Sequence, residues 1–447
     1  MDLVLINPAL FKPEEYKERF DRFLSWVKRG NMYVYPYEPP LGMASIAAVL
    51  KEKGYKVELI DQQGLHIGQE ELVKMIVKLQ PKIIGLTAMT STFPVARKLG
   101  EILKKELPNS LIIAGGVHPT VCPEDTLMGS YFDVIFRGEA EATLPQFMAT
   151  FPDGGWQNTP GIGYKANNKV VLTNMPTLIK DLNNLPQLDY TSFPLDNYVE
   201  YNKSLRGIKG ISMLVSRGCP YQCSFCAVKA TMGRGWRCRS PEAIVEEIKF
   251  LHDNYGIEGI WFKDSILNMD KKWFQQFCNK LLEAELPISW QFNTRVDLLD
   301  AESLTLAKKA GLVQVDLGIE SGSARTLARL KKKTTVQDII SGVSLAKKFV
   351  KVSGFFMIGC PGETMEDIEM TFDLAKSLEL DSCSWSIYNP LPGSELYEEY
   401  IMENPKLASE VEKTHFSHVD TSVCQIPVEI LNAKYKEINS YFADIKE

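Results

Sequence analysis

Three cysteines stand close together near the middle of the chain, and their type and spacing are the best suited to chemistry. Cys219, Cys223 and Cys226 are spaced C-x3-C-x2-C and directly follow an apolar run. A structural zinc site needs four ligands, usually in two C-x2-C pairs, and only Cys238 lies near enough to be a fourth. Three thiolates can instead hold an iron–sulfur cube and leave one iron open to a substrate or cofactor. The spacing favours such a cluster over zinc or inert thiols.

The elements that must position these cysteines begin with residues 1–150, where apolar runs alternate with stretches of helical periodicity. The runs expected to be strands are Leu3–Asn7, Lys56–Asp61, Ile83–Met89, Leu111–Gly116 and Phe132–Phe136. Strands buried on both faces have such continuous apolar sequences. The pattern predicts an α/β fold with a Rossmann-like, doubly wound parallel sheet, whose ligands lie at the carboxyl ends of the strands.

The rest of the chain is expected to form a linker, a second α/β unit and an extension. Residues 151–205 are rich in proline and contain one expected hairpin turn at Asn167–Asn168, so they are predicted to be a linker with a small β excursion. Residues 206–395 resume the strand–helix alternation with six apolar runs. Because eight units are needed to close a barrel, six predict a partial (β/α)6 TIM barrel, followed by a C-terminal extension at residues 396–447.

Composition and charge exclude several broad classes of protein. The chain has 447 residues, 45% of them apolar and 24% charged, which indicates two or three globular domains. Its net charge is −6, whereas a nucleic-acid-binding protein normally has a basic surplus. No apolar stretch approaches the roughly 18 residues of a membrane span. The N-terminal run has no cationic region before it, so a cytoplasmic protein with reduced thiols is expected.

With an aromatic residue just before its last cysteine, the cysteine segment resembles the motif of the radical S-adenosylmethionine (SAM) superfamily. The resemblance implies a 4Fe–4S cluster held by Cys219, Cys223 and Cys226, whose open iron chelates the amino and carboxylate groups of SAM. One electron then cleaves the sulfonium bond and gives methionine and a 5′-deoxyadenosyl radical. Phe225 is expected to pack near the adenine.

Later strand ends in this half resemble the same family. The resemblance implies that Arg295, Glu320, Ser321 and Arg325 surround the ribose and methionine ends of SAM. A carboxylate can accept hydrogen bonds from hydroxyl or amino groups, and an arginine can bind a carboxylate through two hydrogen bonds. The structural alternative is a helix cap at Glu320 and Ser321 with Arg325 on the surface. The run Lys331–Lys333 is interpreted as a solvated face, with orientation of an anionic substrate as the alternative.

The first 150 residues resemble the cobalamin-binding module that precedes the radical SAM domain in one branch of the superfamily. The similar segments lie at or just past the carboxyl ends of expected strands, where small residues let the backbone approach a broad ligand. The resemblance implies cobalamin contacts from Pro40, Leu41, Thr90, Ser91, Thr92, Gly115, Gly116, Val117, His118, Gly138 and Glu139. A domain of this fold with another ligand, or with none, is the alternative.

One departure from many cobalamin proteins concerns the metal. Their D-x-H-x-x-G motif carries a histidine that replaces the base beneath cobalt, and the segment from Asp61 to His66 does not fit that spacing. His118 is expected to contact cobalamin without coordinating cobalt. An unligated lower face would ease release of a methyl group, a hypothesis that nitrogen superhyperfine splitting in a cobalt(II) electron paramagnetic resonance spectrum would contradict.

Together the resemblances imply a cobalamin-dependent radical SAM C-methyltransferase. Reduced cobalt would take a methyl group from one SAM, a second SAM would give the 5′-deoxyadenosyl radical, and an unactivated carbon would collect the methyl group from methylcobalamin. Two alternatives remain open: a cobalamin-dependent cyclase or rearrangement enzyme without methyl transfer, and a non-enzymatic metal-binding or sensor protein. A methylthiotransferase is disfavoured because the first domain has only Cys122 where a second cluster needs three cysteines.

The sequence says less about substrate and partners. Residues 396–447 are too few for an enclosing substrate domain, which favours a peptide, a protein segment or a lipid as substrate. Flavodoxin or ferredoxin is the expected reductant, in an anaerobic cytoplasm. No side chain beyond the cofactor ligands is singled out as a catalyst.

Overall fold

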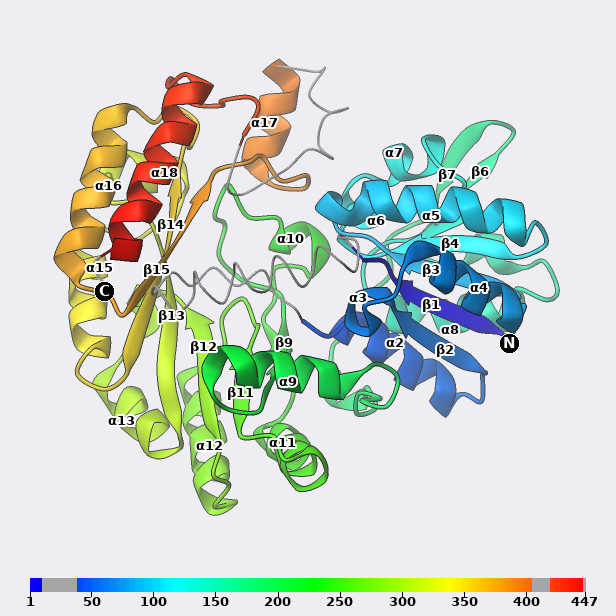
Figure 1. Ribbon diagram of the computed structural model, residues 1–447, viewed down its shortest axis with the longest axis horizontal. Coiled ribbons are helices and arrows are strands. Elements are labelled where there is room, and N and C mark those ends of the chain that lie inside the picture. Colours follow the sequence, from blue (N-terminus) through cyan, green and yellow to red (C-terminus); the bar gives the residue numbers. More distant parts are fainter. Residues whose placement is uncertain (10–37, 404–418, 445–447) are drawn as a thin grey trace.

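The computed structural model describes residues 1–9, 38–403 and 419–444, and places a mainly parallel sheet with helices in each half of the chain (Figure 1). This arrangement confirms the predicted α/β class. No helix in these described ranges combines the length and the apolar character that a bilayer span requires.

The N-terminal sheet has the strand order β2-β1-β3-β4-β5, continued by β6 and β7. The parallel strands are β1 (Leu3–Asn7), β2 (Val57–Asp61), β3 (Ile83–Thr87), β4 (Leu111–Gly115) and β5 (Val134–Phe136). Most of their side chains are buried on both faces of the sheet, which explains the unbroken apolar sequence. The strand order reverses between β1 and β3, and doubly wound sheets bind their ligands at that switch point.

Helices cover both faces of this sheet. One face is covered by α2 (Leu41–Glu52) and α8 (Ala140–Thr150), and the other by α4 (Gln69–Leu79) and α5 (Phe93–Glu106). Short helices lie in two of the connections: α3 (Gln62–Leu65) follows β2, and α6 (Val117–Val121) and α7 (Pro123–Met128) lie between β4 and β5. The core beneath α2 and α8 continues into the C-terminal half, so the two halves share one hydrophobic cluster.

The hairpin expected in the linker is present but extends the N-terminal sheet. It consists of β6 (Ile162–Ala166) and β7 (Lys169–Leu172), and β6 pairs antiparallel with β5. Asn167 and Asn168 form the predicted turn with φ of 49° and 58°, the left-handed conformation that a two-residue hairpin turn uses. The turn is a local signal, whereas pairing with β5 depends on residues distant in sequence.

The C-terminal half is an open, curved sheet of parallel strands, as predicted for a partial barrel. Its order is β15-β14-β13-β12-β11-β8. The strands are β8 (Gly210–Met213), β11 (Gly259–Phe262), β12 (Ser289–Thr294), β13 (Leu312–Glu320), β14 (Lys351–Ile358) and β15 (Ser382–Ile387). The carboxyl ends of all these strands meet at one edge, where barrel enzymes carry their sites.

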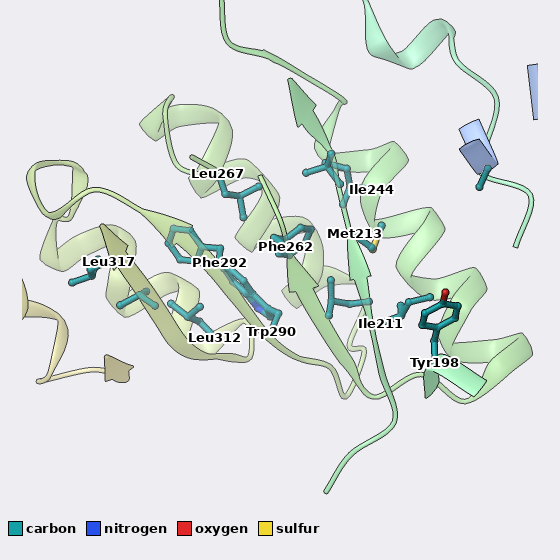
Figure 2. Close-up of a cluster of buried hydrophobic side chains, with 14 of the residues drawn as sticks. Tyr198, Ile211, Met213, Ile244, Phe262, Leu267, Trp290, Phe292, Leu312 and Leu317 are labelled. Carbon is teal, nitrogen blue, oxygen red and sulfur yellow. The ribbon is translucent and has the colours of Figure 1, made fainter. Parts of the chain in front are cut away.

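Most helices of this half lie outside the curved sheet, whereas α17 (Glu395–Glu403) lies at its carboxyl-end edge (Figure 1). The other helices of this half include α11 (Pro241–Tyr255), α12 (Lys271–Glu283), α13 (Ala301–Lys309), α14 (Ala324–Arg329), α15 (Val336–Ala346), α16 (Met365–Leu378) and α18 (Val428–Asp444). Figure 2 shows Trp290 and Phe292 of β12 in the core, where both pack against Phe274 of α12. The alternating residue Gln291 therefore points to the concave side of the sheet.

The helix α9 (Leu195–Arg206) joins the halves at the segment that departs from the cobalamin histidine motif. The Tyr198 hydroxyl donates a hydrogen bond to buried Asp61, and the Asn197 amide donates to the Gly64 carbonyl at 2.8 Å. Burial raises the pKa of the Asp61 carboxyl. Here the segment from Asp61 to His66 contacts α9.

Candidate active site

The three cysteines lie on a loop at the carboxyl end of β8. A short antiparallel ribbon closes the base of the loop, because β9 (Ser216–Arg217) pairs with β10 (Arg237–Cys238). All three thiols are half-buried and form no disulfide. Among the described residues no three candidate ligands converge on a single ion site. A cube bound at three different iron atoms does not require such convergence. The free thiols therefore fit a cluster.

The base of the cysteine loop leaves no room for a side chain at Gly218, which gives a first testable prediction. Its φ is +84°, and a Cβ there would lie 2.1 Å from the Gly235 carbonyl oxygen. Gly218→Ala should force the ribbon apart, beyond the roughly 1–2 kcal/mol that a left-handed alanine costs. We expect this variant to lose most of the iron and sulfide that the wild type binds on anaerobic reconstitution. Gly235→Ala is the matched control, since its Cβ meets nothing within 4 Å; equal metal contents in the two variants would contradict the prediction.

Arg295 lies beside the loop, at the end of β12. Its guanidinium carbon is 3.8 Å from the centre of the Tyr221 ring, and its Nη1 is 4.0 Å from the Cys223 sulfur. It also donates to both carboxylate oxygens of Asp297, at 2.9 and 3.0 Å, and to the Lys332 carbonyl at 2.8 Å. Burial raises the pKa of the Cys223 thiol, and the Lys332 and Arg295 cations oppose that effect. A thiolate at Cys223 would therefore lie beside two positive charges.

Glu320 and Lys332 form a buried ion pair in the same region. Their side chains are 10% and 7% exposed, and the oxygen and nitrogen lie 2.7 Å apart. The register of β13 against β14 shifts between Gly318 and Glu320, and Glu320 has a φ of 69°, so an irregular strand end directs its side chain. The interpretation of Lys331–Lys333 as a wholly solvated face is wrong for Lys332. Its two neighbours are exposed, as expected.

Two other residues expected near SAM have protein partners. Ser321 is fully buried, and its hydroxyl lies 2.8 Å from that of Thr371. Arg325 has a side chain that is 61% exposed and forms an ion pair with Asp367. The surface arginine of the structural alternative is present, but Ser323 caps α14 in place of Glu320 and Ser321. SAM contact by Ser321 or Arg325 stays a prediction.

Phe225 is half-buried and packs against a small apolar cluster. The cluster contains Leu330, Cys360, Tyr388 and Leu396. The preceding residue, Ser224, donates its N–H to the Leu330 carbonyl at 3.0 Å and accepts the Leu396 N–H at 2.9 Å. The cysteine loop is thereby held between the segment after α14 and the start of α17.

A buried acid next to this cluster predicts a pH dependence of stability. Glu363 accepts the N–H groups of Gly359 and Cys360, at 2.6 and 3.0 Å, and burial raises its pKa from 4.5 to about 7. The folded state binds this proton more tightly, so the contribution of Glu363 is present below about pH 4.5 and is lost as the pH rises to about 7.

Glu363→Gln keeps an oxygen for both N–H groups and cannot ionise. On going from pH 4 to pH 8, the variant should lose less unfolding free energy than the wild type, by up to about 3 kcal/mol. Urea unfolding at both pH values measures the difference. The prediction fails if both proteins show the same pH dependence.

The residues expected to contact cobalamin follow the carboxyl ends of strands in the N-terminal half. Pro40 and Leu41 begin α2, Thr90–Thr92 form a turn after β3, and Gly115–His118 connect β4 to α6. The Thr92 hydroxyl accepts the Met89 N–H at 2.9 Å. Met89 and Val117 are 56% and 39% exposed at this edge. Small residues beside exposed apolar side chains fit a broad, partly apolar ligand.

His118 is buried and does not face this edge freely. Its ring stacks on Phe93 with centroids 4.0 Å apart, and its Nδ1 lies 3.4 Å from the Thr90 hydroxyl. Its Nε2 is 3.5 Å from an Asp125 oxygen and has no hydrogen-bond partner among the described residues.

Glu139 lies after Gly138 at the carboxyl end of β5, and its carboxylate binds protein groups. It accepts hydrogen bonds from Arg237 at 3.0 Å and from the Ile179 N–H at 2.8 Å. Burial alone would raise its pKa, but these hydrogen bonds and Arg217 hold the pKa of Glu139 below its ordinary value. Arg217 and Arg237 were not predicted as site residues. They lie on the two-residue strands β9 and β10, which are too short to show a periodic pattern in the sequence.

The ligand edge of the N-terminal sheet meets the cysteine loop directly. The helix α6 lies against α10 (Val228–Thr231), which immediately follows Cys226 (Figure 1). A Cβ on Gly393 would lie 2.8 Å from Val121 of α6 and 2.9 Å from Ala230 of α10. Both predicted cofactor sites therefore border one region.

Comparison with known families agrees with this organisation. The model of the B12-binding domain matches residues 31–148, and the model of the radical SAM superfamily matches residues 213–375. An uncharacterised methyltransferase of Pyrococcus horikoshii is 34% identical over 369 residues, a match that covers 82% of this chain and 79% of that protein.

Two further proteins are similar over most of the chain. The anaerobic magnesium-protoporphyrin IX monomethyl ester cyclase of Cereibacter sphaeroides is 29% identical, and the match covers 81% of this chain and 60% of that protein. The structure of TsrM, a radical SAM methyltransferase of Kitasatospora setae with cobalamin and a 4Fe–4S cluster bound, has the same fold with a TM-score of 0.71 at 17% identity, covering 90% of this chain and 75% of that one. This chain belongs to the radical SAM superfamily, in the branch with a B12-binding domain, and its cofactors are a 4Fe–4S cluster, SAM and cobalamin.

Proposed function

We propose that this enzyme is a cobalamin-dependent methyltransferase that methylates an unactivated carbon. The observation that carries the proposal is the contact between α6, at the ligand edge of the N-terminal sheet, and α10, next to the cysteine loop. When bound, the cluster with SAM supplies radical chemistry and cobalamin supplies the methyl group. The relatives from Pyrococcus and Kitasatospora, both called methyltransferases, support this assignment.

In this proposal the C-terminal residues bind and orient the cluster and SAM. Cys219, Cys223 and Cys226 hold iron through their thiolates. Lys332 balances negative charge beside Cys223 and is suited to the SAM carboxylate, because an ammonium group can donate three hydrogen bonds and Glu320 receives one of them. Arg295 fixes the backbone near Lys332, since its Nε and Nη2 donate to Asp297 and to the Lys332 carbonyl, and its Nη1 is left to face Cys223 and the bound SAM.

The N-terminal edge would bind cobalamin through backbone groups and apolar contacts. Met89 and Val117 offer exposed apolar surface there, and Thr90–Thr92 and Gly115–Gly116 bring backbone close to it. The burial of His118 against Phe93 supports the interpretation that His118 does not coordinate cobalt.

A cyclase or rearrangement enzyme is the second candidate, because the relative from Cereibacter is a cyclase. To separate the candidates, the protein is reconstituted anaerobically with iron, sulfide and cobalamin and given a low-potential reductant with methyl-labelled SAM. Label on the protein-bound cobalamin supports methyl transfer, whereas 5′-deoxyadenosine without label on cobalamin supports the second candidate. A reduced cluster that never cleaves SAM would indicate a sensor.

The substrate and the reductant remain proposals. A peptide, a protein segment or a lipid is the proposed substrate class, and flavodoxin or ferredoxin the proposed electron donor. Electron transfer from reduced flavodoxin to the reconstituted cluster tests the second of these directly.

A further inference from the structure

Two carboxylates of the N-terminal half and two arginines of the C-terminal half form a buried ion network. Arg217 lies 2.5 Å from Glu141 and 3.4 Å from Glu139, and Arg237 lies 2.8 Å from Glu139. The glutamate side chains are 5% exposed, and those of Arg217 and Arg237 are 14% and 12% exposed. The two negative charges of the glutamates balance the two positive charges of the arginines. Ser45 donates a further hydrogen bond to Glu141 at 2.8 Å.

Both arginines come from the ribbon that closes the cysteine loop. Arg217 of β9 is the register partner of Arg237 of β10, so the network holds the ribbon from its two strands at once. On the C-terminal side, Asp264 accepts the N–H groups of Val215 and Ser216, at 3.1 and 2.5 Å. The base of the cysteine loop is thus fixed from both halves of the molecule.

The two carboxylates come from the segment that follows β5 in the N-terminal half. Glu139 follows the carboxyl end of β5, and Glu141 begins the helix that follows it, at the ligand edge of the N-terminal sheet. Buried ion pairs add little stability compared with apolar packing, because desolvation offsets their attraction, but they fix geometry through directed hydrogen bonds. A network that bridges a ligand edge and a loop base is suited to setting the spacing between them.

We propose that Glu139 and Glu141 are positioning residues that, through Arg217 and Arg237, hold the cysteine loop in a fixed place against the cobalamin-binding edge. This inference rests on the proposed binding of cobalamin at that edge. It assigns the Glu139 side chain to the arginines, in place of the direct cobalamin contact expected from the sequence. Binding at the edge should then order the cysteine loop, although the loop belongs to the other half.

Hydrogen–deuterium exchange in the full chain tests whether ligand binding at the N-terminal edge orders the cysteine loop. Hydroxocobalamin is the probe. In the wild type, hydroxocobalamin should slow exchange of amides in residues 218–236 several-fold. The double variant Glu139→Gln/Glu141→Gln should bind hydroxocobalamin, yet exchange in that segment should not change. Lys51→Gln is the matched control, because it removes a different ion pair of the N-terminal half, the one that Lys51 forms with Asp189 of the linker at 2.5 Å. It should behave as the wild type does.

A milder variant keeps the test decisive if the double variant does not fold. Arg217→Lys retains the charge but lacks the planar, forked guanidinium that contacts Glu139 and Glu141, so it should lose most of the effect of hydroxocobalamin on loop exchange. If hydroxocobalamin slowed loop exchange equally in the wild type, the double variant and Arg217→Lys, the inference would be overturned and the proposed function would stand. Absence of hydroxocobalamin binding by the wild type would instead overturn the proposed function, and the inference with it.

Discussion

Replacing Cys223 with alanine is expected to reduce cleavage of SAM to the level of a control without enzyme. The half-buried thiol is one of three candidate ligands, and each of the other two, Cys219 and Cys226, would bind an iron of its own. Loss of one of three thiolates leaves a second iron unprotected, and the cube is then expected to fall apart. The visible absorption of the cluster and the yield of 5′-deoxyadenosine should vanish together.

Cys424→Ala provides the matched control for this loss. Cys424 is also half-buried and free, but its sulfur contacts Ser422 rather than the cysteine loop. The control should keep its iron, its sulfide and its SAM cleavage. A Cys223→Ala protein that still made 5′-deoxyadenosine under the same conditions would refute the assignment of this cysteine.

The second large effect is expected from Lys332→Met. The substitution leaves the Glu320 carboxylate buried without its cation, which typically costs about 3–5 kcal/mol of unfolding free energy. Lys333→Met is a strict comparison, because the adjacent lysine is exposed and should lose almost nothing. Urea unfolding of the three proteins at neutral pH measures the difference. Equal midpoints for the two variants would contradict a buried role for Lys332.

A paired substitution separates the stability of the site from its chemistry. In Glu320→Gln/Lys332→Met neither residue is charged, so much of the lost stability should return. Cleavage of SAM should not return, because the proposed partner of the SAM carboxylate is still missing. If cleavage did recover with stability, Lys332 would be a structural residue only.

Much of the fold could be predicted because its signals are local. Strands such as β1 and β4 are buried on both faces and read as unbroken apolar runs. The Asn167–Asn168 turn needed only two residues that tolerate a positive φ. The cysteine spacing is equally local, so the position of the three cysteines after a strand end followed from the sequence.

The parts that could not be predicted depend on contacts between distant segments. Three successive lysines look alike in sequence, and only the irregular end of β13 buries the middle one. Glu139 was expected at the cofactor, but its partner Arg237 is 98 positions away in the chain. Neither periodicity nor composition carries information about such pairs.

The ribbon at the base of the cysteine loop has a consequence for maturation of the enzyme. Pairing of β9 with β10 already brings the ends of residues 218–236 together, so the entropy of closing that loop is lost when the chain folds and not when metal arrives. Small zinc domains are different, because they fold only as they bind their ion. We expect the apoprotein to keep the pairing of β9 with β10, so that cofactor binding has to order only the residues inside the loop.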